Sequence, residues 1–213
     1  MPNQNLVVPE LAAIQIDGMT RSSFLMKSAL AAGAVYGTAT VGPFVKQAFA
    51  QEGGGGDVDI LNFALTLEYL EAAFYDMGLK ETKGLKGDAK AVAEQLAKDE
   101  NEHVEFLMSA ISDAGGEPVK APGVQFMDAF ASQESFLKLA QTFEDTGVSA
   151  YNGAAPQIQN KDFLAAAGTI VQIEGRHAAL IRFLNGVDIT EGAFDKTLEM
   201  EEVLQAVQPF VKA

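Results

Sequence analysis

The chain has 213 residues, which is long enough for one domain with a substantial hydrophobic core. Hydrophobic residues make up 48% of it and charged residues 21%, a balance that excludes an intrinsically disordered chain. The net charge of −14 argues against nucleic acids and anionic membrane surfaces as partners and favours cations. Because the chain has no cysteine, it has no thiol nucleophile, no ligands for iron–sulfur or zinc-finger sites, and no disulfides.

Residues 1–50 resemble an export signal of the twin-arginine type. A basic motif at 20–25 (TRSSFL) precedes a weakly apolar stretch at 28–50, and Ser22 stands where the second arginine of such a signal belongs. Residues 48–50 (AFA) provide the small residues that a signal peptidase recognises. We therefore expect the protein to be exported, to the periplasm or the extracellular space.

The alternatives for this segment are an uncleaved membrane anchor or a helix of the mature domain. A spanning helix needs about 20 consecutive apolar residues, and four helix-weakening residues interrupt the stretch: Gly33, Gly37, Gly42 and Pro43. We expect cleavage before Gln51, a glycine linker over 51–56, and no membrane contact of the mature chain.

Helical periodicity begins at Asp57. The first helix is predicted over 57–78, and its core-facing stripe contains Ile60, Ala64, Leu67, Glu68, Glu71, Phe74 and Tyr75. A turn at 83–87 and an N-cap at Asp88 precede a second helix, predicted over 88–114 and ended by two glycines. Its stripe contains Val92, Leu96, Glu100, His103, Leu107 and Ala110.

Residues 115–131 contain two prolines and no long period, so they are predicted to form a crossover. The third helix is predicted over 132–153, with the stripe Phe136, Ala140, Phe143, Glu144, Gly147 and Tyr151. The fourth is predicted over 160–185, with the stripe Phe163, Ala167, Ile170, Glu174, His177, Ile181 and Leu184. A fifth helix over 190–211 has no inward charges and is expected to pack outside the others.

The connections between the helices predict the topology. Short turns within each pair predict two antiparallel hairpins, and one longer segment joins them. The expected fold is all-α: residues 57–185 form a four-helix bundle of two hairpins with one crossover, and 186–213 form a C-terminal helix. No segment shows convincing strand alternation.

One pattern occurs twice on these stripes: a lone glutamate on one helix, then Glu-x-x-His on the next. The two copies are Glu68 with Glu100 and His103, and Glu144 with Glu174 and His177. Residues three apart share a helix face, so each Glu-x-x-His pair would chelate or flank one metal ion, with the lone glutamates bridging or capping. Four buried carboxylates need protons or cations, and two divalent ions balance their charge. The alternative is a degenerate site that keeps these polar groups but binds no metal.

The two copies also match in spacing. The lone glutamate precedes the paired one by 32 residues in the first copy and by 30 in the second. A tyrosine follows each lone glutamate by seven residues, Tyr75 in the first copy and Tyr151 in the second. Seven residues are two helical turns, so this internal repeat predicts two hairpins related by a pseudo-two-fold axis.

The ligand pattern resembles the ferritin-like superfamily of di-iron and di-manganese carboxylate proteins over about residues 57–185. The segment 62–71 (NFALTLEYLE) is similar to the opening helix of its secreted, desiccation-related branch. The resemblance implies two Fe or Mn ions, and it implies that their ligands are Glu68, Glu100, His103, Glu144, Glu174 and His177. Ferritins, rubrerythrin-like peroxidases, manganese catalases and oxygenases share this fold, so the fold does not select a reaction.

Three further residues are candidates for a catalytic role: Glu71, Tyr75 and Tyr151. Glu71 is either a seventh ligand or proton acceptor, or an edge residue paired with a cation. Gly147 at the matching position of the second copy has no side chain, which would leave an open coordination position for peroxide or dioxygen. Tyr75 and Tyr151 are expected to be hydrogen-bond donors near the ligands or residues of the core, rather than redox radicals. Arg176 either pairs with a ligand carboxylate or points to solvent.

A carboxylate-rich site with one imidazole per metal favours iron or manganese, which reach the +3 state and react with H2O2 or O2; zinc would bind without redox chemistry. A rubrerythrin-like peroxidase needs an iron–thiolate electron relay, which this cysteine-free chain lacks. Catalase-like dismutation and ferroxidase activity need no external donor and are the expected reactions, in oxidative or desiccation stress. Export favours dismutation, because Fe(II) is scarce in oxidising surroundings.

Two other functions remain open on the sequence. The first is a non-enzymatic, stress-protective protein that holds metal for structure or sequestration, which redox inactivity of the loaded protein would identify. The second is a shell-forming storage ferritin. A homo-oligomer is compatible with the sequence, which reveals no interface.

Overall fold

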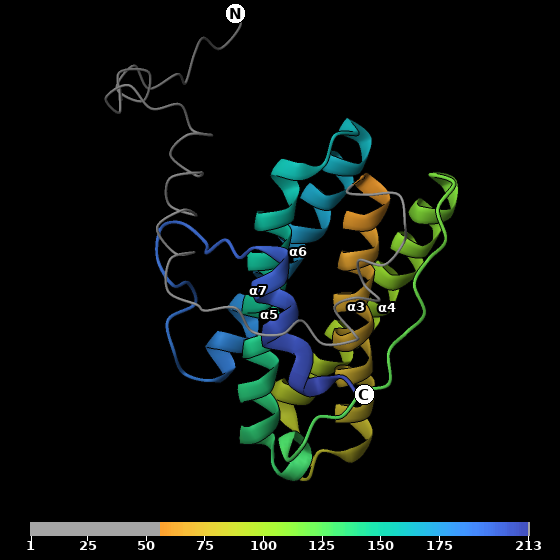
Figure 1. The fold of residues 1–213 in the computed structure, drawn as a ribbon. Coiled ribbons are helices and arrows are strands. Elements are labelled where there is room, and N and C mark those ends of the chain that lie inside the picture. Colours follow the sequence, from red (N-terminus) through yellow and green to blue (C-terminus); the bar gives the residue numbers. More distant parts are fainter. Residues whose placement is uncertain (1–55, 213) are drawn as a thin grey trace, which may run out of the picture. The chain divides into compact units, whose positions relative to one another are not determined.

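The structure is a computed structural model that describes residues 56–212. The predicted export signal at 1–50 and all but the last residue of the linker lie outside the described residues. Four long helices form the bundle (Figure 1): α3 (Asp57–Glu81), α4 (Gly87–Asp113), α5 (Gln133–Ala154) and α6 (Lys161–Leu184). Each boundary lies within three residues of its predicted position. Between 56 and 212 the only strand-like pairing is an isolated bridge of Val124 with Val211, so the all-α prediction is confirmed.

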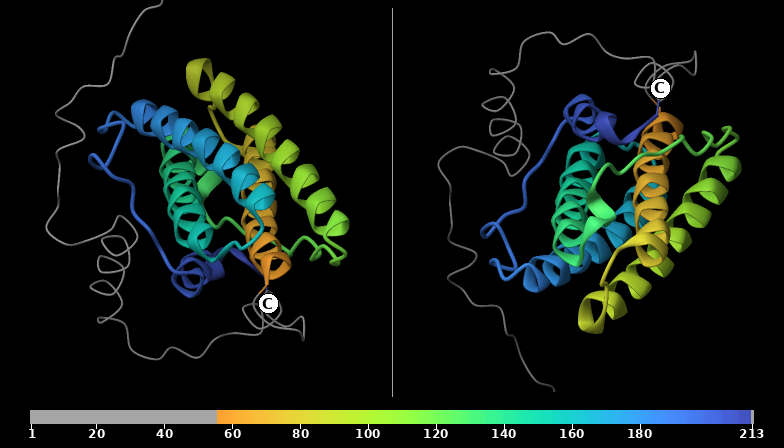
Figure 2. Two further views of the ribbon diagram at one scale, coloured as in Figure 1. Left: turned by 90° about the horizontal axis from the view of Figure 1, so that it is seen from above. Right: turned by 90° about the horizontal axis from the view of Figure 1, so that it is seen from below.

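The helices pair as two hairpins, α3 with α4 and α5 with α6. The hairpins meet through contacts of α3 with α5 and of α4 with α6. Figure 2 shows the four helices from above and from below. Residues 114–132 cross from one hairpin to the other and include the short 3-10 helix η2 (Ala129–Ala131). The buried Asn62 fixes this crossover, because its amide donates to the Glu117 carbonyl and accepts from the Val119 N–H.

Local sequence accounts for most helix ends. Gly115 follows α4 with a φ of 78°, a left-handed conformation that glycine adopts without strain. Ser132 begins α5 in a capping box with Ser135. The predicted N-cap at Asp88 is wrong: Lys86 is the N-cap of α4 and no side chain caps it. The turn passes through a left-handed glycine at Gly87, and the helix starts there.

The predicted fifth helix is too long. Helix α7 spans Met200–Val207 and leads into the 3-10 helix η4 (Gln208–Phe210). The preceding segment from 187 to 199 is not helical and is mostly exposed, so it buries no apolar face that would stabilise a helix. Helix α7 does pack outside the bundle, as predicted, with Val203, Leu204 and Val207 against α3 and α5.

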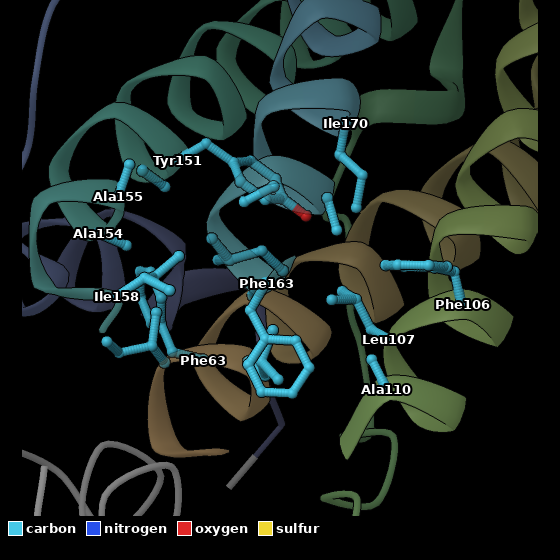
Figure 3. A pocket seen from close by; sticks show the side chains of 17 residues that line it. Phe63, Phe106, Leu107, Ala110, Tyr151, Ala154, Ala155, Ile158, Phe163 and Ile170 are labelled. Atoms are coloured by element: carbon cyan, nitrogen blue, oxygen red, sulfur yellow. The ribbon is translucent and has the colours of Figure 1, made fainter. Parts of the chain in front are cut away.

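The core is divided by the polar residues in the middle of the bundle. On one side lies an aromatic cluster in which Phe74 stacks on Phe136 with ring centroids 5.0 Å apart. On the other side, aliphatic and aromatic residues surround an apolar pocket between the four helices (Figure 3). None of the helices between residues 56 and 212 is long and apolar enough to cross a membrane.

Candidate metal centre

All six residues of the repeated motif meet in the middle of the bundle, and every one of the four helices contributes. Glu68 comes from α3, Glu100 and His103 from α4, Glu144 from α5, and Glu174 and His177 from α6. The four glutamates are fully buried, His177 is 3% exposed, and the His103 side chain is 12% exposed. The stripes inferred from helical periodicity therefore place four carboxylates and two imidazoles away from water.

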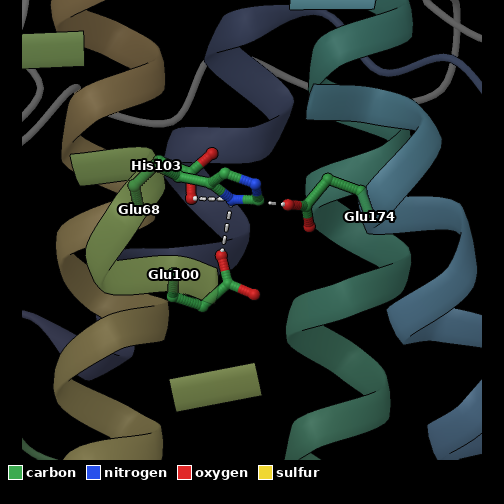
Figure 4. Close-up of side chains that lie close together, drawn as sticks. All are labelled: Glu68, Glu100, His103 and Glu174. Atoms are coloured by element: carbon green, nitrogen blue, oxygen red, sulfur yellow. Dashed lines mark hydrogen bonds and ion pairs between the residues drawn. The ribbon is translucent and has the colours of Figure 1, made fainter. Parts of the chain in front are cut away.

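His103 lies at the centre of three carboxylates (Figure 4). Its Nδ1 is 3.2 Å from Glu68 Oε2, 3.0 Å from Glu100 Oε2 and 3.2 Å from Glu174 Oε1. A single ring nitrogen has one hydrogen at most and cannot donate well to three oxygens. Ligand atoms that each lie about 2.0–2.2 Å from one ion have such mutual separations.

His177 occupies the equivalent position in the second half of the site. Its Nδ1 is 2.8 Å from Glu100 Oε1 and 3.5 Å from Glu144 Oε2. Its other ring nitrogen, Nε2, is 3.2 Å from Asp99 Oδ2. Both imidazoles thus turn Nδ1 inward, toward carboxylates supplied by different helices.

The donor atoms form two overlapping groups, each of which could hold a metal ion. One group is Glu68, Glu100, His103 and Glu174, and the other is Glu100, Glu144, Glu174 and His177, each with its atoms within 4.8 Å of one another. Glu100 and Glu174 belong to both groups, so these two glutamates are placed to bridge. The lone glutamates Glu68 and Glu144 each belong to one group, which is compatible with the predicted capping role.

Unsatisfied polar atoms test whether these residues fit a metal. Six buried side-chain nitrogen or oxygen atoms in residues 56–212 lack a hydrogen-bond partner, and five of them belong to this cluster: Glu100 Oε1, Glu144 Oε2, both Glu174 carboxylate oxygens and His177 Nδ1. His177 Nδ1 is close enough to Glu100 Oε1 for an ion pair but is not aligned for a hydrogen bond. Buried polar atoms without partners are strongly disfavoured. Oxygens and nitrogens that converge with few hydrogen bonds among them fit the binding of cations.

Electrostatics in the metal-free site favour bound protons. Burial raises the pKa of Glu100 to about 7, although the two adjacent histidines oppose the shift. Burial lowers the pKa of His177, but the adjacent carboxylates of Glu100 and Glu144 outweigh it and raise the pKa to about 11. The pKa of His103 is likewise raised well above its usual value, because the three surrounding carboxylates outweigh burial. A metal ion entering the site must therefore displace protons.

Two buried tyrosines connect the hairpins through the capping glutamates. Tyr75 of α3 donates a hydrogen bond of 2.5 Å to Glu144 Oε1 of α5. Tyr151 of α5 donates one of 2.5 Å to Glu68 Oε1 of α3. Burial and the adjacent carboxylate raise the pKa of both hydroxyls well above 10.0, so both are neutral donors. The reciprocal arrangement is what the internal repeat predicts.

Glu71 lies inside the bundle, 4% exposed, and none of the ion pairs found within 56–212 includes it. It is therefore not an edge residue, but it also belongs to neither donor group. A Cβ added to Gly147 would lie 3.1 Å from Glu71 Oε1 and 3.0 Å from Glu174 Oε2. The space that the missing side chain leaves is thus bordered by these two carboxylates. Arg176 is exposed, in agreement with the solvent-facing alternative.

Asp99 is a site residue that the repeat did not reveal. It faces His177 Nε2 across the hairpins and accepts a hydrogen bond of 2.7 Å from Gln95. A carboxylate on the outer nitrogen of a metal-binding histidine fixes the ring and raises its basicity. The only sequence signal for Asp99 is that it directly precedes the ligand candidate Glu100. The repeat gives no support, because Ile173 occupies the matching position before Glu174.

Comparisons with known proteins agree with this architecture. Residues 56–187 match the family described as the ferritin-like domain. No curated protein is significantly similar to the chain. Among solved structures, a conserved hypothetical protein from Mycobacterium tuberculosis is similar with a TM-score of 0.54 and 18% identity, covering 63% of this chain and 94% of that one, which supports the fold alone. Because the family match spans more than half of the sequence and includes all six motif residues, the chain belongs to the ferritin-like domain family.

Proposed function

We propose that this protein binds two iron or manganese ions and uses them in redox chemistry with H2O2 or O2. The observation that carries the proposal is the pair of overlapping donor groups that share Glu100 and Glu174. Four carboxylates and two imidazoles are a hard donor set, suited to iron and manganese. Such ions, when bound, would supply one-electron changes between their +2 and +3 states.

The protein's own residues would set the charge and the proton balance of this chemistry. The four glutamates would neutralise two divalent ions, and the tyrosine hydroxyls hold Glu68 and Glu144 in place. Glu71 is a nearby carboxylate outside both donor groups. Burial and the surrounding glutamates raise its pKa well above 4.5, so it is placed to hold a proton beside the site.

Catalase-like dismutation is the reaction we favour, and ferroxidase activity is the second. Dismutation converts two H2O2 into two H2O and one O2 and needs no reductant other than peroxide. Iron oxidation uses Fe(II) itself as the donor. We also propose that the protein acts outside the cytoplasm, in oxidative or desiccation stress; the resemblance of residues 1–50 to an export signal and of 62–71 to the desiccation-related branch supports this setting.

Oxygen measurements test the redox proposal. The full chain would be loaded with manganese or iron, mixed with H2O2, and followed with an oxygen electrode; Fe(II) oxidation in air would be followed separately by absorbance. Zinc-loaded protein is the matched control, because it fills the same donors without redox chemistry. Oxygen release by the manganese or iron form alone supports dismutation, and Fe(II) oxidation without oxygen release supports ferroxidase activity.

A non-enzymatic, metal-holding protein is the alternative, and the burial of the site favours it. All four ligand glutamates are inaccessible to solvent, which suits an ion held for stability. If the manganese and iron forms neither release oxygen from peroxide nor oxidise Fe(II), this alternative replaces the redox function.

A further inference from the structure

An apolar pocket lies between the four helices at the end of the bundle where α3 and α6 begin and α4 and α5 end (Figure 3). It contains about 490 Å³ of empty space including its open mouth. Residues from all four helices line it, among them Phe63, Leu67, Leu107, Tyr151, Phe163 and Ile170.

The inner wall of the pocket is one helical turn from the candidate metal centre. Leu67 directly precedes Glu68, and Leu107 follows His103 by one turn on α4. Ile170 precedes Glu174 by one turn on α6. Tyr151 spans the remaining distance, because its ring lines the pocket while its hydroxyl donates to Glu68 Oε1. The pocket therefore leads to the half of the centre that contains Glu68 and His103.

The lining selects for apolar ligands. Its surface is entirely apolar, and the one polar group of a lining side chain, the Tyr151 hydroxyl, is already bonded to Glu68. Peroxide or water would lose hydrogen bonds on entering, and a metal ion would lose its hydration shell. The free space is narrow, with room for about one or two water-sized molecules, which suits a small gas better than a bulky hydrocarbon.

A second, smaller cavity lies between α3, α5 and α7. Its lining is also mostly apolar, but it includes two polar residues, Glu71 and Thr146.

We propose that the apolar pocket is the binding and passage site for dioxygen, which enters or leaves the Glu68–His103 half of the centre past Tyr151. The role of dioxygen as substrate or product rests on the proposed function. The affinity of the pocket for a small apolar gas does not rest on the proposed function, because it depends on the lining alone.

Xenon is the probe for the pocket, because it binds apolar cavities and needs no metal chemistry. Crystals of the zinc-loaded full chain would be pressurised with xenon and examined for anomalous density. Ala166→Phe places a ring at the pocket lining, and Ala165→Phe places the same ring on the exposed face of the same helix. We expect xenon in the wild type and in Ala165→Phe and its loss in Ala166→Phe. An empty wild-type pocket would overturn the proposal without bearing on the redox function.

Dioxygen kinetics test the passage. In reduced, iron-loaded protein, Ala166→Phe should lower kcat/KM for dioxygen by roughly tenfold or more, while Ala165→Phe leaves it unchanged. Equal metal content and melting temperature in both variants would show that the fold is intact. Unchanged dioxygen kinetics in a variant that has lost xenon, or an alkyl chain found in the pocket by native mass spectrometry, would overturn the assignment to dioxygen. A wild type that binds xenon but neither consumes dioxygen nor releases it from peroxide would instead refute the redox function.

Discussion

At the scale of single residues, the glutamates of the centre are not equivalent. Glu100 and Glu174 belong to both donor groups, whereas Glu68 and Glu144 belong to one each. Glu100→Gln should therefore abolish binding of both ions, and Glu68→Gln should leave about one ion per chain. Elemental analysis of the purified variants measures this. Glu102→Gln, on the exposed face of the same helix, is the control and should keep both ions. Full metal content in Glu100→Gln would contradict the bridging role.

The two tyrosines provide a second test at this scale. Removing one hydroxyl leaves one lone glutamate without its hydrogen-bond donor. Tyr75→Phe should therefore lower the affinity for the ion near Glu144, and Tyr151→Phe should lower the affinity for the ion near Glu68. Loss of such an outer hydrogen bond lowers metal affinity by roughly 10–100-fold. Competition with a chelator measures the change. The control is Tyr69→Phe, at a half-buried tyrosine on the same helix as Tyr75, which should leave the metal affinity unchanged. Equal affinities in all three variants would exclude a role of the Tyr75 and Tyr151 hydroxyls in metal binding.

The sequence predicts the six motif residues because their spacing alone places them on core-facing stripes. It does not predict Asp99, since that residue lies off the stripe of α4 and meets His177 only through the packing of α4 against α6. Nor does periodicity decide what Glu71 contacts, because the space beside it depends on Gly147 of another helix.

At the scale of helices, close packing of α5 depends on the absence of a side chain at Gly147. A methyl group there would lie 3.0 Å from Glu174 Oε2 and 3.1 Å from Glu71 Oε1, so Gly147→Ala should displace the carboxylates and weaken metal binding. Gly168→Ala on α6 is the matched control, because nothing lies within 4 Å of its added Cβ. The control should gain about 0.5–1 kcal/mol of stability from helix propensity and keep its metal. Chemical denaturation and metal analysis of both variants test this, and normal metal affinity in Gly147→Ala would contradict it.

The four bundle helices are predictable because each has a long apolar stripe, and α5 also begins with a capping box. The extent of the fifth helix is not predictable. The segment from 187 to 199 buries few side chains, and its position depends on backbone contacts with α5. Its Leu198 N–H donates to the Ser149 carbonyl. A side chain at Gly153 would collide with the Leu198 carbonyl, and no sequence period encodes such a close approach.

At the scale of the whole molecule, the buried cluster couples stability to pH. In the metal-free protein every resolved shift in the cluster is upward: His177 from 6.5 to about 11, Glu100 from 4.5 to about 7, and Glu71 and Glu174 well above 4.5. The folded state therefore binds more protons than the unfolded state. The histidine contribution is complete below pH 6.5 and is lost as the pH rises toward 11, and the carboxyl groups destabilise the fold increasingly above 4.5.

Thermal denaturation in a chelator should accordingly give a lower melting temperature at about pH 8 than at about pH 5. High salt serves as the control, because it screens surface repulsion but not the buried cluster. Metal ions displace the same protons, so the rise in melting temperature on metal addition should be larger at the higher pH. A metal-free protein that becomes more stable between these pH values would contradict the coupling.

The most direct test of the dinuclear centre is a count of metal ions per chain. The full chain would be stripped with chelator, reloaded with Mn(II) or Fe(II) without oxygen, freed of excess metal and measured by plasma mass spectrometry. The two donor groups predict two ions per chain, bound at sites that share Glu100 and Glu174. No retained metal under any loading condition would contradict the account.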